Sequence, residues 1–152
     1  MPTNPVPLHK VLYVEDVAVN ALLMKFLFER LPECELVVAA SGREALAAAA
    51  GLRPSLLLLD LRLPDIHGSE LLTLLRHVEG CEHVHAVAVT AEHRYDIRGT
   101  RFDELWSKPL DLAQVATRVR ELVARAAHRA CAPAPLRAPA IAARLAGELH
   151  GL

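Results

Sequence analysis

Polar side chains stand at the ends of short apolar runs at four places in this chain. Glu15 and Asp16 follow the run KVLYV, Asp60 ends SLLLLD, Thr90 ends VHAVAVT, and Lys108 follows DELWS. Three carboxylates in one crevice repel each other, and a hard divalent cation, Mg²⁺ or Mn²⁺, would relieve that repulsion. A hydroxyl and an ammonium group beside the cation would bind the remaining oxygens of a phosphoryl group. These residue types therefore indicate the chemistry of an aspartyl phosphate.

These side chains meet only if the apolar runs are strands of one parallel sheet. Alternating strands and helices favour a doubly wound α/β fold, with a five-stranded parallel sheet and helices on both faces. Functional sites of such sheets lie beyond the carboxyl ends of the strands, where the polar residues stand. The predicted strands are 10–14, 35–40, 55–60, 84–90 and 103–107, and the predicted helices are about 17–31, 41–51, 69–78 and 111–129, with Ser41 and Asp111 as N-caps.

Composition excludes several other classes of protein. The 152 residues suit one domain, and 17 basic against 18 acidic residues leave a formal net charge of −1, which gives no indication of a nucleic-acid surface. No apolar run reaches the ~18 residues that a membrane span needs. Residues 1–8 predict a flexible leader without the apolar core of a signal peptide. The three cysteines have no CxxC spacing and fit reduced thiols, so we expect a cytoplasmic protein.

Four motifs, in order, resemble the receiver domain of two-component response regulators. They are YVEDVAVN, LLLLDLRLPDIHG, VAVTA and WSKPL, and the resemblance covers about residues 10–129, with the domain expected at 9–129. It implies the flavodoxin-like strand order 2-1-3-4-5 and phosphorylation of Asp60 by a phosphohistidine. The donor would be a sensor histidine kinase or a histidine phosphotransfer protein. Such a domain is a signalling module, not an enzyme, and at most catalyses its own phosphotransfer and dephosphorylation.

The resemblance also implies a role for each metal-binding position. Asp16 would contact Mg²⁺ directly, Glu15 largely through water, and the backbone carbonyl of Arg62 would complete the protein ligands together with Asp60.

Further roles follow for the residues around the phosphoryl group. Thr90 and Lys108 would hold its oxygens, and the peptide bond before Pro109 would be cis. Arg62 and Glu92 would form an ion pair over the acyl phosphate and set its hydrolysis rate by limiting access of water.

Three features depart from the family pattern. Thr90 and Lys108 are 18 positions apart (108 − 90), about four fewer than is usual, which predicts a short or distorted fourth helix. Leu105 stands where many receivers have a switch Tyr or Phe. His67 stands where Asp, Asn or Ser is common, which affects the start of the third helix. The output face is therefore expected to be atypical.

Each candidate residue also has an ordinary structural interpretation. Asp16 could cap a helix, Asp60 could be a turn residue, Thr90 could be chosen for its β-branch, and Lys108 could be a surface charge. Their joint position at four strand ends favours the functional interpretation. A metal site among His and Cys residues is disfavoured, because the spacing matches no zinc module; the residues are His77, Cys81, His83 and His85.

Other functional classes fit less well. A haloacid dehalogenase type phosphatase would need an acid where Arg62 stands, and a flavin or nucleotide binder would need a phosphate loop after the first strand. We expect a stand-alone receiver, with a phosphoryl shuttle or sink, or a fragment of a hybrid histidine kinase, as the alternatives. A receiver that binds partners without phosphorylation is less favoured.

We expect no DNA-binding effector in residues 130–152, because this segment is short. They begin as an Ala/Pro-rich linker, after which Ile141, Leu145 and Leu149 recur every four residues and predict one face of a short helix. Because so short a helix is marginal alone, it frays or docks on its own domain, a second copy in a homodimer, or a partner.

Overall fold

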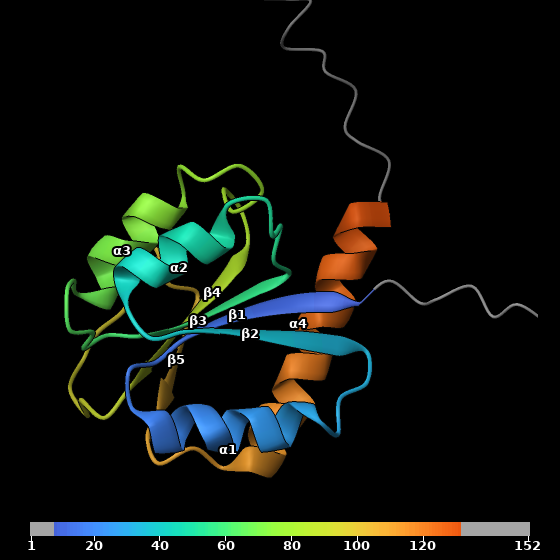
Figure 1. The fold of residues 1–152 in the computed structure, drawn as a ribbon, viewed down its shortest axis with the longest axis horizontal. Helices are drawn as coiled ribbons and strands as arrows, with labels where there is room; N and C mark the ends of the chain where they lie inside the picture. Colours follow the sequence, from blue (N-terminus) through green and yellow to red (C-terminus); the bar gives the residue numbers. More distant parts are fainter. Residues whose placement is uncertain (1–7, 132–152) are drawn as a thin grey trace, which may run out of the picture.

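One parallel β-sheet runs through the part of the chain that the computed structural model describes, residues 8–131 (Figure 1). Its strands lie in the order β2-β1-β3-β4-β5, and every neighbouring pair is parallel, which confirms the expected topology. The strands are β1 (His9–Val14), β2 (Cys34–Ala39), β3 (Leu56–Asp60), β4 (His85–Thr90) and β5 (Glu104–Ser107).

Four helices cover the two faces of this sheet. The helices are α1 (Ala18–Phe28), α2 (Gly42–Ala49), α3 (Gly68–Leu75) and α4 (Leu112–Cys131). α1 and α4 pack on one face, and α2 and α3 pack on the other (Figure 1). Both predicted N-caps are confirmed: Ser41 Oγ accepts from the N–H of Glu44, and Asp111 Oδ1 accepts from the N–H groups that begin α4.

The central strand β3 explains why its apolar run does not alternate with polar residues. Leu56 and Leu58 face the α1/α4 layer, whereas Leu57 and Leu59 face the α2/α3 layer, and all four are fully buried. A strand buried on both faces needs apolar residues at every position. Each buried leucine stabilises the fold by about 1.5–3 kcal/mol, which fixes the strand that carries Asp60.

The prediction of a short or distorted fourth helix between β4 and β5 is wrong, because residues 91–103 contain no helix. The segment instead consists of turns, with Gly99 at a φ of 77°. Its apolar side chains Tyr95, Ile97 and Phe102 cover the sheet face beside α3. Because these residues are spaced two and five apart, they do not form one stripe of a helix. A crossover of this length still spans the distance between adjacent parallel strands.

Two predicted segments lie outside the described residues. They are most of the leader, residues 1–7, and the tail beyond Cys131 with its Ile141, Leu145 and Leu149 stripe. Among residues 8–131, no helix combines the length and the apolar character that a membrane crossing requires.

Candidate functional site

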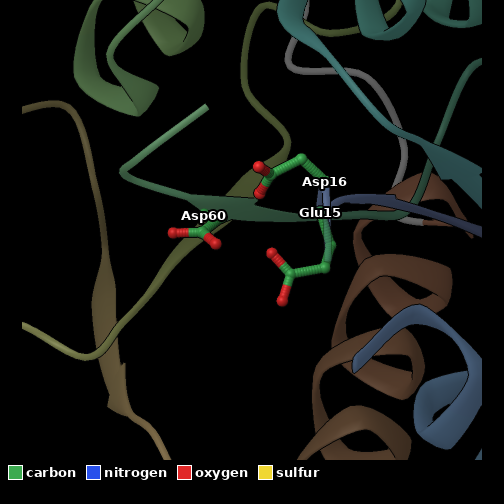
Figure 2. Close-up of side chains that lie close together, drawn as sticks. All are labelled: Glu15, Asp16 and Asp60. Carbon is green, nitrogen blue, oxygen red and sulfur yellow. The ribbon is translucent and has the colours of Figure 1, made fainter. Parts of the chain in front are cut away.

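The predicted polar residues meet at the carboxyl edge of the sheet. Asp60 is the last residue of β3 and pairs in register with Val89, so Thr90 at the end of β4 lies one step beyond it. Glu15 and Asp16 follow β1, and Lys108 follows β5. Asp16, Asp60, Thr90 and Lys108 border a cavity of about 440 Å³, and Glu15 is buried next to them. Figure 2 shows the three carboxylates of Glu15, Asp16 and Asp60 approaching one another from two strand ends.

Lys108 links two of these carboxylates. Its Nζ donates to Glu15 Oε1 at 2.8 Å and to Asp60 Oδ2 at 2.8 Å. The side chain is only 18% exposed, so the interpretation of Lys108 as a surface charge is wrong. Burial alone would lower the pKa of Lys108, but the hydrogen bonds to Asp60 and Glu15 raise it above its usual value. The Lys108–Pro109 peptide bond is cis, as expected.

The loop after β3 fixes the carboxylate of Asp60. The backbone N–H of Arg62 donates to Asp60 Oδ1 at 3.1 Å, and the N–H of Gly68 donates to the carbonyl of Leu61 at 2.8 Å. A Cβ on Gly68 would lie 2.4 Å from the backbone oxygen of Asp60, so only glycine allows α3 to begin this close to the strand. The loop therefore folds back against the residue that it follows.

The pKa values of Glu15 and Asp60 shift in opposite directions. Burial, and next the hydrogen bond with Asp60, raise the pKa of Glu15 to about 7. Burial would also raise the pKa of Asp60, but its interactions with Glu15, Lys108 and the N–H of Arg62 hold it below its usual range. Asp60 therefore gives up its proton more readily than Glu15, and the carboxylate is the form that a nucleophile needs.

Three carboxylates fit a divalent cation. One oxygen from each of Glu15, Asp16 and Asp60 lies within 4.8 Å of the others, and all are hard ligands of the kind that Mg²⁺ prefers. Glu15 Oε2 is buried without a hydrogen-bond partner among the described residues, as expected for an atom that awaits a ligand. Among residues 8–131, no His or Cys joins a group with metal-ligand spacing.

Asp16 does not cap the first helix. α1 begins at Ala18, its N-cap is Val17, and no side chain there accepts from the helix N-terminus. Asp16 is exposed at the mouth of the cavity, so the capping interpretation is wrong and the carboxylate stays available at the site.

The predicted ion pair over the cavity is confirmed. Arg62 Nε and Glu92 Oε1 lie 2.7 Å apart, and both residues border the cavity. The N–H of Glu92 also donates to Thr90 Oγ1 at 3.0 Å, which links the hydroxyl at the end of β4 to this ion pair. Because the Arg62 side chain is 79% exposed, the pair contributes little to stability, about 0.2–1 kcal/mol.

The sequence interpretation missed Asn20. Asn20 lies in the first turn of α1, and its Nδ2 donates to Glu15 Oε1 at a distance of 2.6 Å. When a helix begins at residue 18, a side chain five residues after Glu15 lies over the end of β1. The five-residue spacing between Glu15 and Asn20 could therefore have predicted their contact.

His67 shapes the start of the third helix, as its position predicted, and Leu105 packs in the core. His67 caps α3 by accepting from the N–H of Ser69 at 3.2 Å, and its ring centroid lies 6.0 Å from that of Tyr95. Leu105 packs as an aliphatic residue against the α2/α3 layer, while Trp106 packs on the opposite face.

Known proteins resemble this chain in sequence and fold. Residues 11–120 match the family model described as the response regulator receiver domain. The chain is 37% identical over 81 residues to the polar-differentiation response regulator DivK of Brucella ovis, a match that covers 53% of this chain and 65% of that protein. The match thus spans slightly less than two thirds of that relative.

Solved receiver structures have the same fold. A CheY-like receiver domain from Methylobacillus flagellatus is 28% identical, with a TM-score of 0.67 over 76% of this chain and 98% of that one. The receiver domain of the sensor histidine kinase PA1611 from Pseudomonas aeruginosa, solved with a magnesium ion in its active-site cleft, is 23% identical, with a TM-score of 0.69 over 77% and 98%. Since the family model spans well over half of the chain, the protein belongs to the response regulator receiver domain family of two-component signalling.

Proposed function

We propose that this chain is a phosphorylation-controlled switch in which Asp60 accepts a phosphoryl group from a phosphohistidine. The observation that carries the proposal is the Asp60 carboxylate, which borders the cavity and accepts hydrogen bonds from Lys108 Nζ and the N–H of Arg62. A carboxylate oxygen attacks phosphorus, the P–N bond breaks, and the imidazole nitrogen leaves with the electron pair and takes up a proton. The donor is a sensor histidine kinase or a histidine phosphotransfer protein.

The surrounding residues would stabilise the charge that develops on the phosphoryl oxygens. Lys108 supplies an ammonium and Thr90 a hydroxyl, both already positioned at the cavity. Mg²⁺ or Mn²⁺ would be held by Asp16, Asp60 and the backbone carbonyl of Arg62, with Glu15 acting largely through water. When bound, the cation neutralises negative charge on the transferring group. The three-carboxylate cluster of this chain supports this assignment.

The output would run through an atypical face. In this chain residues 91–103 form turns instead of a helix, and Leu105 occupies the position of the usual switch aromatic. These two features support partner binding through an unusual surface, or a role as a phosphoryl shuttle or sink. A receiver fragment of a hybrid histidine kinase fits the same site. The domain boundaries 9–129, a cytoplasmic location and a possible homodimer belong to this proposal, with no role for nucleic acid or membrane.

Intact mass after incubation with acetyl phosphate and Mg²⁺ tests the proposal. The parent protein should gain one phosphoryl group, and Asp60→Asn should gain none. Asp96→Asn is the matched control, because it makes the same chemical change at an exposed carboxylate that pairs with Arg98 away from the cavity. Two results would contradict the proposal: a phosphoryl group gained by Asp60→Asn, or no phosphoryl group gained by the parent protein with either acetyl phosphate or a phosphohistidine donor.

A further inference from the structure

α1 is apolar on two opposite faces, which is unusual for a helix at the surface. Ala21, Met24, Leu27 and Phe28 are buried against the sheet. The opposite face carries an outer stripe, which we define as Val19, Leu22, Leu23 and Phe26, and these four residues are 59%, 52%, 47% and 58% exposed. Their spacing of i, i+3, i+4 and i+7 places them in one line along the helix. A helix that is apolar all round is normally covered on all sides.

The outer stripe continues into a groove beside the start of α4. Leu23, Leu110 and Leu112 line this groove, which encloses about 180 Å³, and Leu112 is itself 37% exposed. No described residue covers the stripe, whose members are all exposed. A contiguous apolar patch of this kind marks an interaction surface.

The same chain carries a segment that matches the outer stripe. After α4 ends at Cys131, an Ala/Pro-rich linker leads to Ile141, Leu145 and Leu149, which recur every four residues. As a helix, residues 141–149 would present a stripe about 12 Å long, and Val19 to Phe26 extends about 10.5 Å along α1. The two stripes therefore have similar lengths.

The linker is long enough to bring the two stripes together. α4 starts beside Leu23, where Leu112 lies in the groove, and passes the end of α1, where Arg120 Nε pairs with Glu33 Oε1 at 2.9 Å. The return from Cys131 to the level of Leu112 is therefore about 29 Å along the helix axis. Residues 132–140 span up to about 30 Å when extended, a conformation that prolines favour.

The direction of the chain agrees with this route. Because α4 runs past the end of α1 toward Cys131, a chain that returned from Cys131 would meet the C-terminal end of α1 first and would lie antiparallel to it. In that direction, with Ile141 at the level of Phe26, Leu149 would reach the level of Val19, so the two stripes would overlap along their length.

We propose that residues 141–149 form a helix that docks on the outer stripe of α1 within the same chain. A nine-residue helix is marginal alone, but the tether gives it a high effective concentration at the stripe, and burial of both apolar faces stabilises it. This docking does not depend on phosphorylation of Asp60.

Thiol labelling of a reporter beside the stripe tests the docking in the full chain. Val19→Cys places the thiol on the outer stripe, in a Cys131→Ser background, because Cys34 and Cys81 are buried. A tail docked nine-tenths of the time slows maleimide labelling about tenfold. Leu145→Asp should therefore raise the labelling rate about tenfold, and Ala143→Asp, which puts the same charge on the opposite side of the predicted helix, should leave it unchanged.

A second reporter and a dilution series complete the test. Thr73→Cys, exposed on α3 at the other face of the sheet, should label at one rate in all tail variants. Slow labelling of Val19→Cys that becomes faster on dilution would instead assign the stripe to a second copy of the chain. Fast labelling in every variant would show that the stripe is bare in the isolated protein and left to another partner. Either result would overturn intramolecular docking.

Discussion

The ion pair between Arg62 and Glu92 lies at the opening of the cavity, where water would reach an acyl phosphate on Asp60. We expect the double variant Arg62→Ala/Glu92→Ala to shorten the phosphoryl lifetime roughly three- to tenfold, equal to about 0.7–1.4 kcal/mol of barrier. The decay of phosphorylated protein followed by intact mass measures it. The control is Asp96→Ala/Arg98→Ala, which removes another exposed ion pair from the segment that carries Glu92. Equal lifetimes in the parent and both variants would contradict a role in excluding water.

Gly68 is the residue whose replacement should disturb the site most without touching its chemistry. A Cβ there would lie 2.4 Å from the backbone oxygen of Asp60 and 2.9 Å from Leu61 Cα, and neither backbone atom can move cheaply. Gly68→Ala should lower the free energy of unfolding by about 1–3 kcal/mol and slow phosphorylation by acetyl phosphate. Urea unfolding and intact mass measure the two effects. Thr73→Ala on the exposed side of the same helix should change neither.

At the scale of elements, β5 and α4 are joined by a charged cluster around Glu104. Arg118 pairs with Glu104, and Trp106 Nε1 donates to Glu104 Oε2 at 3.0 Å. Burial would raise the pKa of Glu104, but its hydrogen bonds from Arg118 and Trp106 hold it below its usual value. A depressed folded-state pKa stabilises the protein above the unfolded pKa, and that stability is lost as the pH falls through the folded pKa.

The free energy of unfolding at acid pH should therefore depend on Glu104. We expect Glu104→Gln to cost about 1–2 kcal/mol at pH 7 and progressively less as the pH falls below about 4. Fluorescence of Trp106, the single tryptophan of the chain, reports urea unfolding at each pH. Exposed Glu121, which pairs with Arg118 at 2.9 Å, provides the control Glu121→Gln, which should shift the curve much less. A constant difference between parent and Glu104→Gln at all pH values would refute the assignment.

The elements also show what the sequence pattern predicts well and where it stops. The buried strand at Leu56–Asp60 and the polar residues at the strand ends were predictable, because a parallel sheet brings its carboxyl ends together. Residues 91–103 were predicted wrongly, because the number of residues between Thr90 and Lys108 does not tell a short helix from a series of turns. Asn20 was missed because its contact with Glu15 depends on the residue at which α1 begins.

Across the whole molecule, the site and the turn segment 91–103 form one continuous region. Ala91 and Glu92 line the cavity, while Tyr95 and Phe102 from the same segment pack on the sheet. Thr90 Oγ1 accepts from the N–H of Glu92, so a phosphoryl oxygen that accepted a hydrogen bond from the Thr90 hydroxyl would draw Glu92 along with Thr90. Phosphorylation is therefore expected to act first on the turn segment, with no helix between β4 and β5 to carry the change.

Hydrogen exchange measured by mass spectrometry tests whether phosphorylation of Asp60 changes the turn segment 91–103 or another output face. With acetyl phosphate and Mg²⁺, exchange should slow severalfold in residues 62–67 and 91–103, because each segment begins with residues that border the cavity. The amino ends of the strands and the second half of α4 should not change, since they lie at the opposite edge of the sheet. Asp60→Asn under the same conditions should show none of these effects. If protection instead spread along α4 and left residues 91–103 unchanged, the turn segment would not be the element that reads the state of Asp60, and the output face would have to lie on the α1/α4 layer.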